Sequence, residues 1–233
     1  MIPIQKGAAP IELELKIKEV KATPDTTLNW PNVSGTLRLA DGTEKSVVDA
    51  VKQALLRDQG GICAYCMRRI DLGSSHVEHI VPQAEGRGSD DPLSVDYGNM
   101  LAVCDGFKGD KNGLTCDRAR GNKHMTVNPL KSQTLAGIRY FRDGRIGSEQ
   151  SEIIVDLTKT LNLNQGTLRK NRKAVIDELG RYFKRLDERG KSVSAHCKKQ
   201  LDALKSETTK KSEYQGVRIY FLEKRLRAES KRG

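Results

Sequence analysis

Residues 63–82 read CAYCMRRIDLGSSHVEHIVP and combine the two features that decide the fold. Cys63 and Cys66 form a C-x-x-C pair, which places two thiolates on one tight turn and commonly begins a tetrahedral zinc site. Glu78 and His79 follow within apolar flanks that predict a short strand. Neighbouring residues on a strand point to opposite faces unless a bend or bulge turns both toward one site.

Two further cysteines, Cys104 and Cys116, lie downstream of this stretch. Residues 105–115 separate them, a wider gap than zinc-binding pairs usually have, and a loop that closes on itself would return Cys116 to the metal. Four thiolates leave no open position for water, so we expect a structural zinc at these cysteines rather than four unrelated reduced thiols. The rival ligand set replaces the second pair with His76 and His79, whose spacings are too short for a two-Cys two-His finger.

These motifs, with Asn99-Met100-Leu101 and the acid that follows the last cysteine, resemble the HNH endonucleases. That family has a zinc-stabilised ββα-metal fold. Residues 55–66, 127–129, 161–164 and 168–176 look like the PtuB-type nucleases of Septu anti-phage systems and their retron-linked relatives. The resemblance covers roughly residues 46–186.

The resemblance implies a role for each residue of the motif. His79 would be the general base that deprotonates the attacking water, and Asn99 would orient its loop by hydrogen bonding. Glu78 and Asp117 would hold one Mg²⁺ or Mn²⁺ ion, because these hard cations prefer carboxylate oxygens.

Other positions near the motif stay open. The family usually has Asn or His after the last cysteine, so Asn122 or His124 is an alternative to Asp117 as the metal ligand. Arg120 or Lys123 would contact the scissile phosphate. His76 would either contact phosphate or face solvent.

The charge of the chain is concentrated at one end. The 233 residues carry a formal net charge of +11, yet residues 1–150 hold 20 Lys+Arg against 19 Asp+Glu, and residues 151–233 hold 21 against 11. This excess favours a polyanionic partner over a mere effect on solubility. We therefore expect the C-terminal part to bind nucleic acid or to dock a partner, with four cations near its start as candidates: Arg169, Lys170, Arg172 and Lys173.

Composition excludes several other classes of protein. A mean hydropathy of −0.59 and the lack of a long apolar run argue against a membrane span, and five cysteines argue against a disulfide scaffold. The sequence starts with neither a secretory nor an organelle-targeting pattern, so we expect the protein in the cytoplasm.

The expected fold class is α+β, in three parts. Residues 1–45 form an N-terminal extension, in which residues 11–18 alternate as a strand would, although Pro10 equally suits a helix start. Residues 46–150 hold the nuclease core and the zinc site, entered through a helix that Ser46 caps and Gly60 ends. Residues 151–233 form a basic region of three helices, with the aromatic residues and Cys197 in its core.

The expected function is a metal-dependent endonuclease acting on nucleic acid, with DNA favoured and RNA possible. The resemblance further implies anti-phage defence with an ABC-type ATPase partner of the PtuA kind, and this chain has no Gly-Lys-Ser or Gly-Lys-Thr phosphate loop of its own. The alternatives are a non-catalytic zinc module that binds nucleic acid or a partner, and a toxin nuclease that cleaves RNA.

Overall fold

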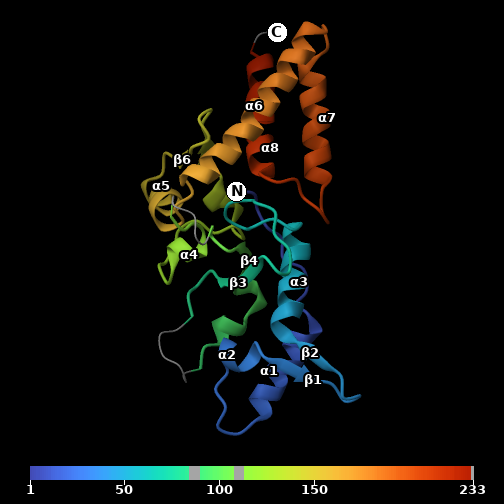
Figure 1. Ribbon diagram of the computed structural model, residues 1–233, viewed down its shortest axis with the longest axis vertical. Coiled ribbons are helices and arrows are strands. Elements are labelled where there is room, and N and C mark those ends of the chain that lie inside the picture. The colour runs from blue at the N-terminus through green and yellow to red at the C-terminus, as the bar shows by residue number, and fades with distance from the viewer. Residues whose placement is uncertain (84–89, 108–112, 232–233) are drawn as a thin grey trace.

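The centre of the molecule is an antiparallel pair of strands, β3 (Ser75–His79) and β4 (Met100–Cys104), as Figure 1 shows for the computed structural model. The structure describes residues 1–83, 90–107 and 113–231. His79 pairs with Met100 at one end of the ladder, and Ser75 pairs with Cys104 at the other. All five residues of β4 are buried, so the apolar run of this strand forms the middle of the core.

The free edge of β4 is covered by helix α3 (Val47–Gln59). The side chain of Gln59 donates to the carbonyl of Ala102 and accepts from its N–H, both at 2.8 Å. The expected helix limits are confirmed: the Ser46 hydroxyl caps the N-terminus, and Gly60 ends the helix with φ 66°. A hairpin of β1 (Thr36–Arg38) and β2 (Glu44–Ser46) leads into this helix.

The strand predicted for residues 11–18 is wrong, and the helix that the alternative reading allowed is present as α1 (Ile11–Ala22). The carbonyl of Pro10 accepts the N–H groups of Leu13 and Glu14 and starts the helix. Leu13 and Val20 lie two turns apart and are buried, whereas Ile11 remains 56% exposed. Burial therefore follows the helical period rather than the alternation that the sequence shows.

Short elements connect these parts of the core. Helix α2 (Trp30–Val33) precedes the first hairpin, and two 3-10 turns, η1 (Pro92–Val95) and η2 (Tyr97–Asn99), lead into β4. After β4 come α4 (Asp117–Arg120), the 3-10 turn η3 (Ser132–Leu135) and the hairpin of β5 (Ile138–Tyr140) and β6 (Ile146–Ser148). Helix α5 (Ser151–Val155) continues into a π-helical turn, η4 (Asp156–Thr160). Helices and small two-stranded sheets thus give the expected α+β class.

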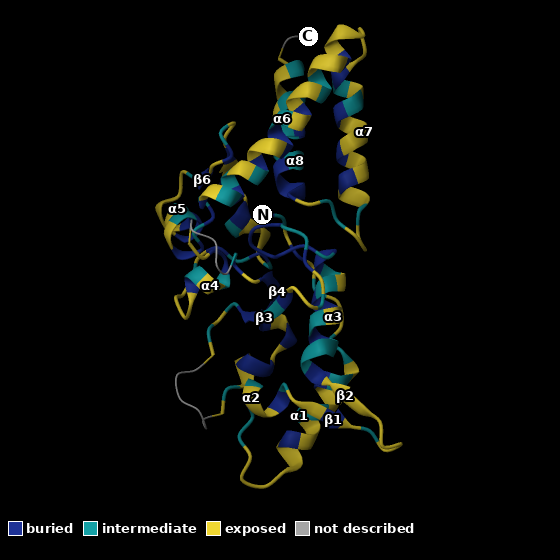
Figure 2. Cartoon of the chain, viewed as in Figure 1, coloured by how far each residue is buried: buried dark blue, intermediate teal, exposed yellow. Residues whose placement is uncertain are grey.

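Three long helices form an arm that extends away from β3 and β4 (Figure 1): α6 (Gly166–Glu188), α7 (Val193–Ser206) and α8 (Gln215–Glu229). The arm has a small apolar cluster of its own, which includes Leu186, Cys197 and Leu222. Tyr182, Phe183 and Phe221 pack against it. The helices predicted in the C-terminal region and the burial of Cys197 are confirmed, and Figure 2 shows the exposed residues on the outer faces of the arm.

The arm is attached to the core at the turn that follows the first cysteine pair. The carbonyl of Met67 accepts the N–H of Tyr214 at 3.0 Å, and the carbonyl of Gly60 accepts the N–H of Lys211 at 2.9 Å. A Cβ atom at Gly60 would lie 2.5 Å from Cγ of Lys211, so this glycine lets the two segments meet.

No helix in the described part of the chain combines the length and the apolar character needed to cross a membrane.

Candidate functional site

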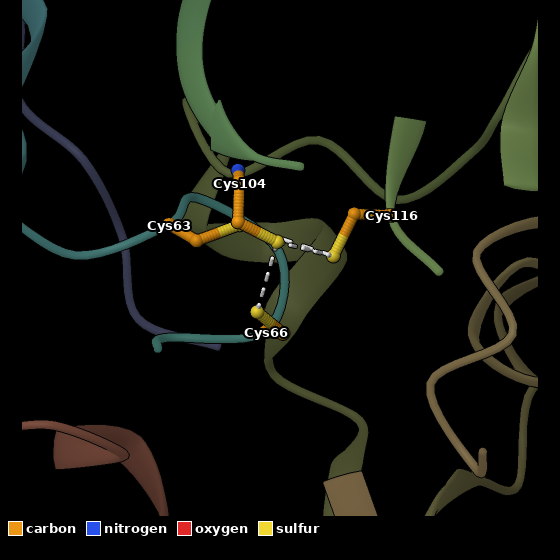
Figure 3. A group of neighbouring side chains, drawn as sticks. All are labelled: Cys63, Cys66, Cys104 and Cys116. Atoms are coloured by element: carbon orange, nitrogen blue, oxygen red, sulfur yellow. Dashed lines mark hydrogen bonds between the residues drawn. The ribbon is translucent and has the colours of Figure 1, made fainter. Parts of the chain in front are cut away.

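The four cysteines meet at the end of β4 opposite to His79 (Figure 3). All four are buried, and their Sγ atoms all lie within 4.8 Å of one another. The Sγ atoms of Cys63 and Cys116 are 3.9 Å apart, those of Cys66 and Cys104 are 3.8 Å apart, and those of Cys104 and Cys116 are 3.7 Å apart. A disulfide would need a sulfur–sulfur distance of about 2.0 Å, so these are free thiols.

Backbone contacts bring the distant cysteines together. The N–H of Thr115 donates to the carbonyl of Gly106 at 2.9 Å, so the described ends of the 105–115 loop close as expected; residues 108–112 lie outside the described part. Cys116 has φ 57°, which turns its side chain back toward the other three sulfurs. The N–H of Cys104 points at Sγ of Cys63 at 3.4 Å.

This geometry fits a tetrahedral metal ion such as zinc. Zinc binds thiolates at about 2.3 Å, which sets neighbouring sulfurs about 3.8 Å apart in a tetrahedron. Hydrogen bonds from the neighbouring thiols hold the pKa of Cys104 far below that of a free thiol, so at least one thiolate is favoured here before a metal binds. Among the residues described, these four cysteines are the one group of three or more His, Cys, Asp or Glu side chains gathered this closely.

Strand β3 presents its two candidate residues to opposite sides, as regular strand geometry requires. Glu78 lies toward Tyr65 and Arg120, whereas His79 lies toward Trp30 and the turn that carries Ser94. The structure therefore does not bring the side chains of Glu78 and His79 into contact with each other.

The His79 ring is buried and fixed from three directions. Its Nε2 atom lies 2.8 Å from the carbonyl of Ser94, its Nδ1 atom lies 3.1 Å from Nε2 of Gln83, and Trp30 packs edge-on at 5.6 Å between ring centroids. A carbonyl can only accept, so Nε2 carries the proton. The neutral ring then has its lone pair on Nδ1, where the amide of Gln83 donates to it.

Burial also determines the charge of this ring. Desolvation lowers the pKa of His79 below that of an exposed histidine, and the carbonyl of Ser94 opposes this only in part. The imidazole is therefore neutral near pH 7, with a basic nitrogen.

Asn99 binds the backbone of two segments next to His79, the one that follows it in the sequence and the turn before β4. Its Oδ1 atom accepts the N–H of Val81 at 2.8 Å, and its Nδ2 atom donates to the carbonyls of Val81 and Leu93 at 3.1 and 3.0 Å. One side chain thus ties the segment after His79 to the turn that supplies the Ser94 carbonyl. These are the contacts of a positioning residue, and its part in catalysis stays a prediction.

Arg120 does not lie where a phosphate contact requires it, and that prediction is wrong. Its side chain is buried, ion-paired with Glu78, and donates to the carbonyls of His79 and Ile80 at 2.7 and 2.6 Å. Its Nε atom donates to the carbonyl of Lys123 at 2.8 Å. Arg120 fastens helix α4 to β3, because the fold surrounds it with acceptors that use its donors internally.

Glu78 is held inside the protein by the same contacts. Its Oε1 atom accepts from Arg120 and from the hydroxyl of Tyr65, the latter at 3.0 Å. Burial raises the pKa of Glu78, the negative charge of Asp117 raises it further, and Arg120 opposes both effects. The two carboxylates thus lie close enough to repel each other.

Asp117 begins helix α4 and pairs with His76, whose Nε2 atom lies 2.5 Å from Oδ2. His76 thus contacts a carboxylate, which neither of its expected placements included. The other oxygen of Asp117, Oδ1, is buried without a hydrogen-bond partner. A buried carboxylate oxygen left without a partner suits a hard divalent cation. Asn122 and His124, the alternatives for this ligand, are both exposed.

The four cations expected at the start of the helical region do not share one environment. Arg172 is buried and donates to the carbonyls of Gly144 and Leu163 at 2.7 and 2.6 Å, so its predicted role in nucleic-acid binding is wrong. It fastens α6 to the turn between β5 and β6. Lys170 is exposed, while Arg169 pairs with Asp143 at 3.3 Å and Lys173 with Asp177 at 2.6 Å.

Sequence reasoning missed several residues around these sites. Gln83 and Ser94 contact His79 from outside the motif, and only the fold reveals them. Tyr65 lies inside the C-x-x-C turn, where a polar aromatic residue is a signal that could have been noticed. Arg118, an exposed cation on α4, was also missed, whereas Lys123, which was predicted to contact phosphate, is exposed just after this helix.

The comparisons with known proteins point in the same direction as the motif. No family model matches the chain. A protein of Vibrio cholerae serotype O1 biovar El Tor, named "Retron Vc95 putative HNH endonuclease", is 24% identical over 185 residues, which cover 77% of this chain and 84% of that protein. This relative supports an HNH nuclease family.

One solved structure aligns with part of the chain. It is the Type II-C Cas9 enzyme from Actinomyces naeslundii, 26% identical with a TM-score of 0.28. The alignment covers 49% of this chain and only 9% of Cas9. A TM-score this low establishes no common fold between the two proteins.

Proposed function

We propose that the protein is a metal-dependent endonuclease of the HNH type, which hydrolyses phosphodiester bonds in nucleic acid. The observation that carries this proposal is the environment of His79. A buried, neutral imidazole is held through Nε2, and its other nitrogen has a lone pair available as a base. In this proposal β3, β4 and α4 are the two strands and the helix of a ββα-metal unit.

His79 acts as the general base. Its Nδ1 atom takes the proton of the attacking water, and the Ser94 carbonyl stabilises the imidazolium that forms, because it accepts the N–H on the far side of the ring. Gln83 must give up its hydrogen bond to Nδ1 when that water arrives. Asn99 keeps both supporting segments in place during the step.

Two metal ions have different tasks in this proposal. Zinc on the four cysteines is structural, since four thiolates close its coordination shell. Glu78 and Asp117 would hold the catalytic ion, Mg²⁺ or Mn²⁺, with Oδ1 of Asp117 available for it. When bound, such an ion polarises the phosphate and stabilises the leaving oxygen.

The substrate and the biological role follow from the resemblance and from charge. DNA is the favoured substrate, with RNA as the alternative. The resemblance of the motif and its flanks to the PtuB-type nucleases supports a role in anti-phage defence, together with an ABC-type ATPase of the PtuA kind. Lys123 and Lys170 are exposed, and in this proposal they contact the substrate or the partner.

A second function is favoured by one specific observation. Both candidate metal ligands already have protein partners: Glu78 pairs with Arg120, and Asp117 pairs with His76. A zinc-stabilised module that only binds nucleic acid or a protein would have such pairs as permanent contacts, whereas a nuclease must rearrange at least one of them.

Cleavage assays separate the two functions. We would incubate plasmid DNA and total tRNA with the zinc-loaded protein and Mg²⁺ or Mn²⁺, with and without an ABC-type ATPase of the PtuA kind. His79→Ala should reduce cleavage roughly 10²- to 10⁴-fold, the usual contribution of a general base. His196→Ala, at a histidine of α7 whose Nδ1 atom contacts the carbonyl of Ser192, is the matched control and should cleave like the wild type. Equal cleavage by the wild type and His79→Ala would favour the binding module.

A further inference from the structure

A large cleft lies between the arm and the core. It is lined by the N-terminal segment, the end of α3, the β5 region, the end of α7 and one face of α8, and its volume is about 1140 Å³. Lys6 belongs to this lining, and its Nζ atom donates to the carbonyl of Met100 in β4 at 2.9 Å. The cleft exceeds the usual size of a small-molecule pocket.

The acids that line the cleft are occupied by the protein itself. Asp58 accepts from the N–H of Gly7 at 2.9 Å and from the hydroxyl of Tyr97 at 2.7 Å. Glu207 accepts the N–H of Ser212 at 2.6 Å, and Glu223 pairs with Lys205 at 3.5 Å. These three are the acidic residues of the lining, against six Lys and Arg.

Several of the cations have no such partner. Within the described residues, neither Lys6, Lys211 nor Arg227 forms an ion pair with a carboxylate. Burial lowers the pKa of Lys6 to about 7 and also lowers that of Lys211, and the negative charge of the nearby Asp58 opposes this only in part. An anionic ligand in the cleft would supply the missing negative charge.

An aromatic ring completes the lining. Tyr220 is half-buried at the cleft wall, supported edge-on by Tyr140 and Phe221 at 5.6 and 5.4 Å between ring centroids. Cations beside an aromatic surface form the combination that binds single strands, because phosphates pair with the cations while bases stack on the ring. An acidic protein segment would use the cations but would gain little from the ring.

We propose that this cleft is a binding site for single-stranded nucleic acid, separate from the site at His79. It would hold a strand along α8, with phosphates at Lys211 and Arg227 and a base stacked on Tyr220. The inference goes beyond the proposed cleavage reaction and concerns binding alone, so its test does not depend on whether His79 catalyses anything.

The test is equilibrium binding of fluorescein-labelled 12-mers of oligothymidylate and oligouridylate, followed by fluorescence anisotropy. The protein is the full zinc-loaded chain with His79→Ala, so that cleavage cannot affect the readout. Adding Lys211→Gln and Arg227→Gln should weaken binding at least tenfold and reduce the slope of log affinity against log salt by about 1.4. Lys210→Gln with Lys224→Gln removes the same charge from exposed residues of the same loop and helix, outside the lining, and should change affinity less than threefold.

A second pair of variants tests the ring. Tyr220→Ala should weaken binding roughly fivefold to a hundredfold, while Tyr220→Phe keeps the stacking surface and should bind like the parent. Melting temperatures of both variants show whether the fold is intact. Equal losses from the two charge-removing pairs would overturn the proposal, since diffuse charge would then explain the binding. Displacement by polyglutamate as effective as by oligonucleotide, with no effect of Tyr220→Ala, would also overturn it and indicate an acidic protein segment instead.

Discussion

The cysteine cluster and the His79 pocket lie at opposite ends of one five-residue strand pair, about 13 Å apart along the strands, and they are prepared in different ways. At the cysteine end, four side chains from three segments already lie at zinc-binding distances and contact one another. At the candidate catalytic site, each acid is held by a basic side chain of the protein: Glu78 pairs with Arg120, and Asp117 pairs with His76.

This difference is what we expect between a structural metal site and a catalytic one. Thiols that are gathered and buried can bind a metal without changing their partners, so the metal strengthens an arrangement that exists already. Carboxylates that are paired with basic residues keep the fold intact without a catalytic metal, yet they must release or share those partners to bind one. The following variants test this contrast, beginning with the largest expected effect.

Loss of one zinc ligand should have the greatest consequence. Cys66→Ala should lower the melting temperature by more than about 10 °C and abolish zinc binding, because a structural zinc contributes a large part of folding stability in small metal-bound cores. The measurements are zinc content by mass spectrometry and thermal unfolding by circular dichroism. Cys197→Ala, at an equally buried thiol in the arm, is the control and should retain the zinc. Unchanged zinc content in Cys66→Ala would refute the four-cysteine site.

Removal of Arg120 should rank second. Arg120→Met leaves Glu78 buried without its cation and three backbone carbonyls without their donor, so we expect a loss of about 3–5 kcal/mol in the free energy of unfolding. Urea denaturation of the zinc-loaded protein gives this value. Arg118→Met, an exposed residue on the same short helix, should cost less than about 0.5 kcal/mol. Similar losses in the two variants would mean that the Glu78 pair is not what holds α4.

Gln83 offers a smaller and opposite effect. Because its amide donates to Nδ1 of His79, the nitrogen proposed as the base, Gln83→Ala should raise the rate of cleavage about two- to tenfold, the factor that corresponds to one modest hydrogen bond. Single-turnover cleavage is the measurement, with Gln200→Ala on the exposed surface of α7 as the control. A slower Gln83→Ala enzyme would show instead that Gln83 orients the ring or the water.

The smallest effect concerns pH and Lys6. The pKa of Lys6 falls from its ordinary 10.5 to about 7 in the folded protein, so the unfolded chain binds more protons between those values and stability rises with pH there. The cost of burying the charged form is full below about pH 7 and disappears above about pH 10.5. Lys6→Met should flatten this rise by about 1 kcal/mol between pH 7 and 8, measured by urea denaturation. Lys45→Met, at an exposed site, controls for the loss of one charge; equal slopes for the wild type and Lys6→Met would contradict the shift.

Local sequence signals predicted the parts of the fold that local physics decides. Ser46 and Gly60 marked both ends of α3, because a side-chain cap and a left-handed residue act within one turn. The C-x-x-C turn marked the cysteine cluster for the same reason. The alternation in residues 11–18 misled because a helix buries only the residues one face presents, here Leu13 and Val20.

The basic residues show where sequence reasoning stops. Arg120 and Arg172 look like surface cations in the sequence, but both are buried. Their acceptors are carbonyls from residues 79, 80, 123, 144 and 163, and only the completed fold brings these together. Gln83 and Ser94, the partners of His79, were missed for a similar reason, since the spacing of the motif does not predict them.

The bond between the cysteine turn and the arm has a consequence for how the protein is made. Met67 contacts Tyr214 and Gly216, and Val217 is fully buried in the main core, so residues from both ends of the sequence share one packed unit. A ribosome synthesises residues 46–130 long before residue 217, and domains fold as their parts emerge. The nascent chain therefore carries the complete His79 motif while its core still lacks the residues at the start of α8 that complete it. Synthesis itself therefore delays completion of the core until α8 has left the ribosome.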